Sequence, residues 1–557
     1  MSPSLVSLRA ALLVSAAAAL GACTTVRERP AGAVLKSTLT DDPAKLQVWT
    51  LGAIEVRTRD IYSPEEVERS ALARLLNATH RRTREVVVQR ELWIGPGQPI
   101  RGVDAEELER NLRATGLFAE VRATLHPTEQ EGVVDLLVET EDRLSLAIGA
   151  SGSVVGAVSS LGTTVSESNL LGYGDRATIG YSENSDGEFR GVLSYRDRHF
   201  LGSWVTASAQ VGRTEEGDFA SLGLERPFKY LSDDDSWRVN AGTSNSAIDY
   251  YEAGASVAEV PQSRDSFETA VFRRYGPAER RWTLGLRARH DAIGVGSARG
   301  PAAATIDVPG DADTTFAGFS FGHRRLLGFR KVEALDTLGY IQDLSLSAGF
   351  DALIGATYRV EEGESDALQP TFSLGSHVAL EPFIDTFVAA RIDGSARVEA
   401  GEARGWAVGA DLTAFELSFA PQTFAAHLAY NEAFEGDALP VQLTLGEDQG
   451  LRGYPTREFT GDRVLRLNFE DRIDLHAAIG TFRFGGVVFF DAGWIEDRGE
   501  GLGAPLTSTG LGLRIGSDAL FGPRVLRIDF SIPLSAFDGE RYDPLLSISF
   551  GQVFGFE

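Results

Sequence analysis

The chain has 557 residues, a net charge of −26 and a pI near 4.8, which exclude one small domain and argue against a nucleic-acid-binding surface. Its hydrophobic content of 43% and mean hydropathy of −0.09 fit a soluble protein, and they also fit a β-barrel with a polar lumen. Beyond the N-terminus, no apolar run approaches the roughly 20 residues that a membrane-spanning helix needs. The 60 glycines favour many short strands and turns.

Residues 1–22 read as an export signal, with Arg9 ahead of the apolar run Ala10–Leu20. Leu20-Gly21-Ala22-Cys23 then resembles a bacterial lipobox, which implies cleavage before Cys23 and its acylation, so that lipid chains anchor the N-terminus. Cys23 is the sole cysteine, which rules out an intrachain disulfide. The alternative is an ordinary secretory signal with an incidental cysteine.

Residues 23–45 lack periodicity and predict a flexible tether, and residues 46–142 predict a small α+β domain. Ile54 and Val56 alternate with polar neighbours and indicate a strand. Ser63-Pro64-Glu65-Glu66 forms a capping box that begins a helix extending to about Leu76. The remaining predicted elements are a β-rich run over 86–94, a second helix capped by Asp104 and Glu107 and ended by Gly116, and strands over 121–125 and 133–138.

Residues 143–557 contain recurring segments that alternate polar and apolar side chains between turn signals. A period of two with a polar file and an apolar file is typical of a strand between two solvents. At about 10 residues per strand plus loops, this length predicts an all-β transmembrane barrel of about 16 antiparallel strands. The last strand is expected to place Leu546, Ile548, Phe550, Gln552, Phe554 and Phe556 on one face.

The stretch Gly446–Thr460 is polar and glycine-rich, and it contains Leu451-Arg452-Gly453-Tyr454. Two alternating segments follow it: Val464–Leu475, with Glu470 in its polar file, and Phe482–Trp494, with Asp491. A guanidinium has five donors in a planar fork and can bridge two carboxylates. We therefore expect Arg452 to point into the lumen and to pair with Glu470 and Asp491.

This combination resembles the Omp85 superfamily (BamA/TamA-like), outer-membrane barrels that insert or translocate other proteins. Its hallmark is a V/L-R-G-Y/F loop folded into the lumen, whose arginine contacts an acidic residue on the following strands. The resemblance extends to Asn169-Leu170-Leu171-Gly172-Tyr173-Gly174-Asp175, at the entry to the early barrel strands. Arg113-Ala114-Thr115-Gly116-Leu117-Phe118, with Val121, resembles the end of a single POTRA-type periplasmic domain.

The resemblance implies that Arg452, Gly453, Tyr454, Glu470 and Asp491 form a lumenal latch. Gly453 would permit a tight turn and Tyr454 would pack against the inner wall. A static lumenal salt bridge that only stabilises the barrel is the alternative reading of the same residues.

The function implied is assembly or translocation of unfolded client polypeptides at the bacterial outer membrane, with the POTRA-type domain in the periplasm and accessory periplasmic proteins as further partners. The predicted client-binding positions are Val121 and Val134 in the POTRA-type sheet, whose edge captures extended peptides, and Ile548 and Phe550 at the seam between the first and last barrel strands. A weakly paired seam exposes backbone groups that template an incoming strand. No cofactor, metal or nucleic acid is implied.

Three other functions remain open at this stage. A passive pore or structural surface barrel would use the loop only to constrict its lumen, although a porin has no reason to carry a POTRA-type domain. Gly318-Phe319-Ser320-Phe321-Gly322 matches the G-x-S-x-G of an esterase, but it lies in an alternating strand without the following helix that a nucleophile elbow needs. A two-partner secretion role would need a dedicated exported protein.

Overall fold

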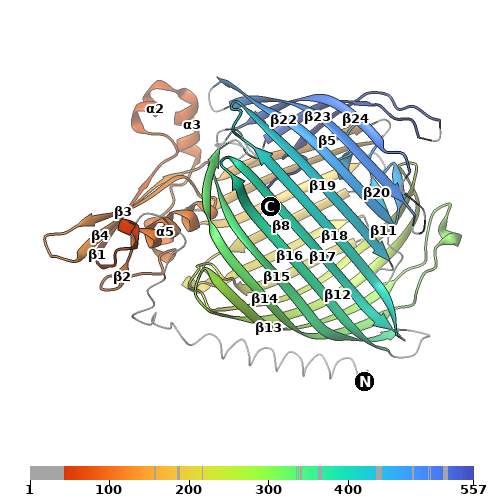
Figure 1. Cartoon of the computed structure of the whole chain (residues 1–557), viewed down its shortest axis with the longest axis horizontal. Helices are drawn as coiled ribbons and strands as arrows, with labels where there is room; N and C mark the ends of the chain where they lie inside the picture. Colours follow the sequence, from red (N-terminus) through yellow and green to blue (C-terminus); the bar gives the residue numbers. More distant parts are fainter. Residues whose placement is uncertain are drawn as a thin grey trace.

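A small α+β unit lies at one end of a large β-barrel in the computed structural model of the chain (Figure 1). The structure describes residues 43–155, 158–184, 189–215, 217–333, 335, 338, 341–361, 367–399, 401–434, 442–479, 482–497, 499, 501, 503–517, 525–537 and 539–556. Cys23 and the predicted signal and most of the tether therefore lie outside the described residues. No helix within the described ranges is long and apolar enough to cross a membrane.

The α+β unit contains a four-stranded sheet in the order β2-β1-β4-β3. β1 and β4 pair in parallel, β3 and β4 pair antiparallel, and β3 is an edge strand that pairs with β4 alone among the described residues. The elements of the unit, in chain order, are η1 (Pro43–Leu46), β1 (Trp49–Arg59), α2 (Pro64–Arg69), α3 (Ala71–Thr79), α4 (Glu85–Arg90), β2 (Pro99–Ile100), α5 (Gly102–Ala114), β3 (Phe118–Pro127) and β4 (Val133–Asp142).

Local signals begin and end these helices. Ser63 accepts a hydrogen bond from the Glu66 amide, and the Glu66 carboxylate accepts one from the Ser63 amide, which completes the predicted capping box. Helix α2 ends at Ser70, whose extended backbone breaks the single predicted helix in two and whose side chain caps α3. Gly116 has a φ of +72° just beyond α5, a conformation that glycine adopts without strain.

Two predictions for this unit are wrong. Residues 86–90 of the expected β-rich run lie in helix α4, because Val87 and Val88 are buried there against the sheet, and tertiary packing overrides their strand propensity. Val134 lies on β4, which has β1 on one side and β3 on the other, so it is not at a sheet edge. Its side chain is buried in the core of the unit, with Leu51 and Leu136.

Twenty strands form a closed antiparallel barrel among the described residues, which confirms the predicted fold class. Each strand pairs with its neighbours in sequence, and β22 follows β19 directly in the wall. The barrel strands are β5 (Leu146–Val155), β6 (Val158–Leu170), β7 (Asp175–Asn184), β8 (Phe189–Asp197), β9 (Thr206–Thr214), β10 (Gly217–Arg226), β11 (Asp235–Glu252), β12 (Ala255–Tyr275), β13 (Arg280–Val295), β14 (Ala312–Glu333), β15 (Ile341–Glu361), β16 (Ala367–Phe383), β17 (Thr386–Glu399), β18 (Glu402–Glu416), β19 (Gln422–Phe434), β22 (Arg463–Ile479), β23 (Phe482–Glu496), β24 (Leu506–Gly516), β25 (Val525–Pro533) and β26 (Leu545–Phe550).

The expected number of about 16 strands is too low because several connections are much shorter than assumed. Only two residues separate β9 from β10, β11 from β12 and β17 from β18. The outer wall carries exposed apolar side chains at alternate positions, as a lipid-facing surface requires. Examples are Leu222, Leu286, Ile354, Leu374 and Leu511.

The barrel closes at a thin seam. Strand β26 has only six residues and meets β5 at a single register pair, Ile548 with Gly152, in the described part of the chain. By contrast, β25 pairs with β26 at six positions, and β5 pairs with β6 at ten.

The C-terminal residues leave the wall and enter the lumen, contrary to the expectation of one strand face that extends to Phe556. Gly551 has a φ of +92° and donates its amide to the Val525 carbonyl, which turns the chain inward. Phe554 is buried, and its ring packs on His427 and Phe415 of the inner wall. Strand β26 is therefore short because its expected second half, residues 551–556, is an inward tail.

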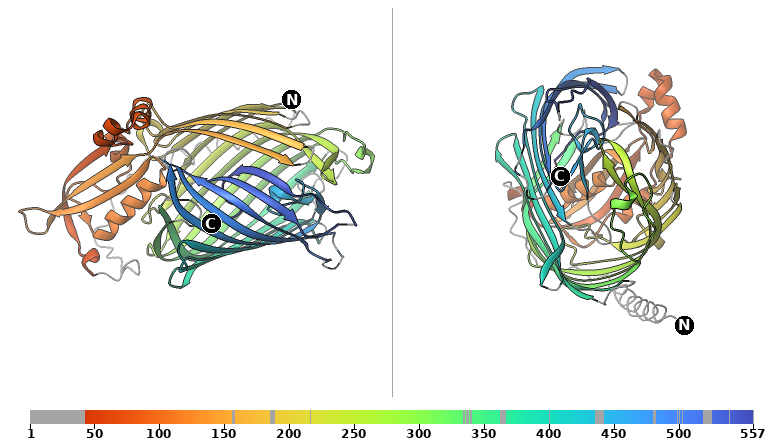
Figure 2. Two further views of the ribbon diagram at one scale, coloured as in Figure 1. Left: turned by 90° about the horizontal axis from the view of Figure 1, so that it is seen from above. Right: turned by 90° about the vertical axis from the view of Figure 1, so that its right-hand side faces the viewer.

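The α+β unit is held against the barrel turns at one end, behind the barrel in the end-on view of Figure 2. The carbonyls at the end of α4 accept hydrogen bonds from the Trp204 indole (2.9 Å, at Arg90) and from the Tyr230 hydroxyl (2.5 Å, at Glu91). The Glu91 carboxylate contacts Lys229 and lies 3.3 Å from the His199 ring.

Two further contacts hold the unit on either side of this one. The Asn169 side chain donates to Thr83 (2.9 Å), and Arg113 of α5 forms a two-pronged ion pair with Asp343 of β15 at 2.7 and 2.9 Å. Contacts to two barrel turns and to the ends of β6 and β15 therefore set the orientation of the unit.

Candidate functional site

The connection between β19 and β22 starts at the barrel end away from the α+β unit and folds back into the barrel (Figure 1). A two-stranded ribbon of β20 (Leu443–Leu445) and β21 (Phe459–Gly461), with the short helix η4 (Glu447–Gln449), supports the loop that follows. The pairing of β20 with β21 brings the two ends of the loop together, so that its apex, residues 451–454, points at the inner wall.

Gly453 is required at this apex. Its φ is +91°, and an added Cβ would lie 3.3 Å from the Ser508 Cβ and 3.4 Å from the Ser531 Cβ of the wall. Its amide donates to the Glu447 carboxylate at 3.1 Å. A side chain here would be strained by the backbone conformation and would lie in tight contact with the wall.

Arg452 is fully buried and binds two wall carboxylates. Its Nε and one terminal nitrogen donate to the two oxygens of Asp491 on β23 at 2.7 and 2.8 Å, and its other terminal nitrogen donates to Glu470 on β22 at 2.7 Å. The guanidinium carbon lies 3.5 Å from the centre of the Phe489 ring. The structure thus brings together the three charged residues that the sequence singles out.

The remaining loop residues fix the position of Arg452. Asn468 of β22 donates to the Gly450 carbonyl at 2.7 Å and to Asp491 at 2.8 Å. The Tyr454 ring is buried between Phe459 and Tyr542, and its hydroxyl donates to the Thr507 carbonyl at 2.8 Å.

The ion cluster is larger than the sequence predicts. Arg514 of β24 donates to Asp529 of β25 at 2.5 Å, and Asp529 also lies 3.7 Å from Arg452. Arg472 of β22 donates to Glu470 at 2.8 Å. Arg514 and Asp529 occupy polar positions of alternating strands, which is the only signal in the sequence that points to them.

The cluster contains three buried arginines (452, 472 and 514) and three buried carboxylates (470, 491 and 529), and the less buried Arg527 lies 3.3 Å from Asp529. Attraction within such a cluster mainly offsets the cost of removing its charges from water, so its presence is weak evidence for stability. Removing one member leaves an unpaired buried charge and costs about 3–5 kcal/mol. This cluster therefore specifies the position of the loop more than it stabilises the barrel.

Arg472 connects the cluster to the inward tail. Besides Glu470, it donates to the Phe554 carbonyl at 2.9 Å and to the Leu335 carbonyl, in the β14–β15 connection, at 2.8 Å. Arg514 also donates to the Gln552 side chain at 3.0 Å. The loop apex, the C-terminal tail and a barrel turn near the α+β unit are consequently joined by one hydrogen-bonded network.

The other predicted positions lie apart from this cluster. Ile548 is half exposed on β26 and forms the one register pair of the seam, and Phe550 ends that strand. Val121 lies on the edge strand β3 with its side chain buried, whereas Val134 is interior.

Ser320 lies in the middle of β14, paired with Gly285 and Leu353, and is followed by strand rather than helix. No group of three or more His, Cys, Asp or Glu within the described ranges is placed to hold a metal ion.

No protein-family model matches the chain. A curated protein described as a "Putative outer membrane protein assembly factor" from Treponema pallidum is 24% identical over 191 residues, which are 32% of this chain and 23% of that protein. The match thus spans about a quarter of the relative, and it bears out the resemblance to outer-membrane assembly barrels.

The solved structures that are similar to this chain include two outer-membrane proteins, BamA and CdiB. BamA from Haemophilus ducreyi lacking POTRA domains 1–3 is 12% identical with a TM-score of 0.40, over 89% of this chain and 84% of that one. CdiB from Escherichia coli is 12% identical with a TM-score of 0.45, over 90% of this chain and 76% of that one.

Proposed function

We propose that this chain is an Omp85-type barrel that inserts or translocates unfolded client polypeptides at the bacterial outer membrane. The observation that carries the proposal is the seam, where β26 and β5 share one register pair while their other neighbours pair fully. A barrel selected only for stability gains by pairing every strand, because an unpaired backbone group in lipid costs several kcal/mol. Opening the wall at the seam therefore breaks the fewest backbone hydrogen bonds and requires the least free energy.

Opening the seam creates two strand edges, which bind an incoming strand through backbone hydrogen bonds. The exposed positions at this edge include Ile548, and Phe550 lies at its end. Client folding supplies the free energy, so the mechanism needs neither nucleotide hydrolysis nor a cofactor.

In this proposal, the α+β unit is a POTRA-type domain in the periplasm that captures extended clients. The support is its edge strand β3, which contains Val121 and has no second partner strand among the described residues. Edge strands bind extended peptides by adding one strand to the sheet. Two barrel turns and the ends of β6 and β15 hold the unit beside the barrel end, so a captured client is already near the lumen and the wall.

The lumenal latch regulates the seam in this proposal. Arg452 fixes the loop on Glu470, and Arg472 ties Glu470 to the tail that continues from the last strand. Lipid anchoring at Cys23 and accessory periplasmic proteins stay predictions. The alternatives are a passive pore, in which loop and tail only narrow the lumen, and export of one dedicated partner.

Photo-crosslinking in cells tests the proposal, with probes at Thr124, which is exposed on β3, and at Ile548. A probe at Leu286, which is exposed on the outer wall away from the seam, serves as the control. Adducts with many barrel proteins at both test positions support an insertase, and one abundant exported protein supports a dedicated exporter. Client adducts at neither position, together with open-channel conductance in bilayers, would leave a pore.

A further inference from the structure

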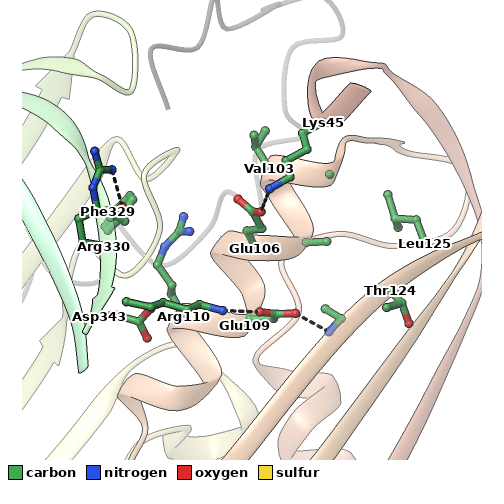
Figure 3. A pocket seen from close by; sticks show the side chains of 14 residues that line it. Lys45, Val103, Glu106, Glu109, Arg110, Thr124, Leu125, Phe329, Arg330 and Asp343 are labelled. Atoms are coloured by element: carbon green, nitrogen blue, oxygen red, sulfur yellow. Dashed lines mark hydrogen bonds and ion pairs between the residues drawn. The ribbon is translucent and has the colours of Figure 1, made fainter. Parts of the chain in front are cut away.

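A cleft of about 540 Å³ separates the α+β unit from the barrel (Figure 3). Helix α5 and edge strand β3 form one side, and the end of β14 with the start of β15 forms the other. In this view Arg110 of α5 extends towards Phe329 of the barrel, whereas Glu106 pairs with Lys45 and Glu109 accepts a hydrogen bond from the Ala123 amide.

The outward backbone groups of β3 face this cleft. In an antiparallel pair, successive residues direct their amide and carbonyl alternately towards and away from the partner strand. The Ala123 amide donates to a side chain, the Glu109 carboxylate, at 3.0 Å, so Ala123 points away from β4. Val121 and Leu125 share that direction by the same alternation.

Glu109 is held at the Ala123 amide by cations from two elements. Its second oxygen lies 3.3 Å from the Lys331 ammonium on the barrel and 3.4 Å from Arg113 on its own helix. Arg113 is in turn fixed to Asp343 of β15. The side chain of Glu109 is 16% exposed, so this carboxylate lies inside the contact between unit and barrel rather than on a free surface.

We propose that Glu109 is a removable cap on the edge of β3, and that the partner that fits the cleft is an extended polypeptide segment whose backbone carbonyl replaces the Glu109 carboxylate at the Ala123 amide. This inference rests on the proposed function for the identity of the segment as a client. A carboxylate oxygen and a peptide carbonyl accept from the same amide, so only one of them occupies the site at a time.

The displaced carboxylate retains its charge partners, because Arg113 and Lys331 lie beside it whether or not it accepts from Ala123. The barrel supplies Lys331 and anchors Arg113 through Asp343, so docking of the unit on β14 and β15 helps to hold the Glu109 carboxylate at the Ala123 amide. Docking thus favours the capped edge, and movement of the unit away from these strands favours an open one.

The test uses the purified full-length protein in detergent micelles with a photo-crosslinking residue at Thr124, which lines the cleft. The probe is a biotin-tagged ten-residue peptide of alternating valine and threonine. Glu109→Ala is expected to raise the adduct yield about 5- to 10-fold, because the peptide no longer competes with a charge-assisted hydrogen bond. Glu109→Gln should stay within about 2-fold of the parent, since its amide oxygen still accepts from Ala123.

Glu106→Ala is the matched control, because Glu106 lines the same cleft from the same helix but pairs with Lys45. Equal yields for Glu109→Ala and the parent overturn the cap. So do equal, raised yields for Glu109→Gln and Glu109→Ala, because charge rather than the acceptor would then be responsible.

Hydrogen exchange of the fragment 118–127 without peptide is a second readout. Glu109→Ala should remove the protection of one amide there, and unchanged protection overturns the cap. Client adducts in cells that are the same for Glu109→Ala and the parent contradict the cap and leave the proposed function intact. If the micelle experiment supports the cap but no variant gives client adducts in cells, the proposed function is contradicted and the cap is not.

Discussion

Arg472 donates hydrogen bonds to the Phe554 carbonyl at 2.9 Å and to the Glu470 carboxylate at 2.8 Å. One side chain therefore holds both the C-terminal tail and a carboxylate that binds the lumenal loop. The tail follows directly from β26, which is one side of the seam. Three hydrogen-bonded contacts therefore connect the loop apex to this tail: Arg452 with Glu470, Arg472 with Glu470, and Arg472 with the Phe554 carbonyl.

Arg472→Ala is expected to destabilise the barrel and to release the tail. The substitution removes a positive charge that compensates the buried Glu470 carboxylate, and it leaves the Phe554 carbonyl without this hydrogen bond. The free energy of unfolding should fall by about 3 kcal/mol. Urea unfolding of the refolded barrel in micelles measures this loss, and proteolysis at the C-terminus reports the released tail. Arg483→Ala, an exposed arginine on β23, is the control and should change neither. A tail that resists proteolysis as well as the parent's would contradict the link.

Arg452→Lys is expected to be nearly as damaging as Arg452→Ala. An ammonium lacks the planar fork that binds both oxygens of Asp491 and also reaches Glu470. The expected loss is about 2 kcal/mol or more of unfolding free energy, whereas Arg483→Lys should have no measurable effect. If Arg452→Lys kept full stability and client handling, the positive charge of Arg452 alone, and not its planar fork, would account for its role.

A disulfide across the seam should stop client handling. Gly152→Cys with Ile548→Cys joins the two residues of the single register pair, whose expected Cα separation in an antiparallel ladder is compatible with a disulfide. Oxidation should abolish client insertion and a reductant should restore it. The control pair Phe530→Cys with Leu546→Cys joins β25 to β26 without crossing the seam and should leave insertion intact. Normal insertion with an oxidised seam would argue against lateral opening.

Acid should loosen the α+β unit from the barrel through Glu91. Burial raises the pKa of Glu91, but His199 and the charge of Lys229 outweigh it and hold the pKa below the usual range of a glutamate. A lowered folded-state pKa contributes stability that is complete above the unfolded value of about 4.3 and is lost as the pH falls through the folded value. The contribution of Glu91 to docking should therefore be complete above about pH 5 and weaken below about pH 4.

The rate of amide hydrogen exchange of residues 85–94, measured as a function of pH, reports this docking. Glu91→Gln should remove the acid-dependent part of the change and show weaker docking at neutral pH, because Lys229 loses its partner. Glu85→Gln is the control, since Glu85 is exposed on the same helix. An identical pH profile for the parent and Glu91→Gln would place the acid sensitivity elsewhere.

The sequence alone determined the features that rest on local chemistry. Alternation with a period of two predicts a barrel because the two faces of each strand meet different solvents, and the capping box at Ser63 predicts the start of α2 because its hydrogen bonds span three residues. Arg452 was identifiable with Glu470 and Asp491 because the loop motif and the two strands that follow it are close in the chain.

Other features depend on residues that are distant in the chain, and they follow from the tertiary structure. The helical state of Val87 and Val88, the interior place of Val134 and the entry of Arg514 and Asp529 into the ion cluster each follow from what packs beside them. The inward tail follows the same rule, because Phe554 alternates like a lipid-facing residue and leaves the wall for the carbonyl contact with Arg472 and the aromatic inner surface. Alternating polar and apolar residues indicate that the two faces of a strand meet different environments. Where the strand ends depends on the contacts that form in the closed barrel.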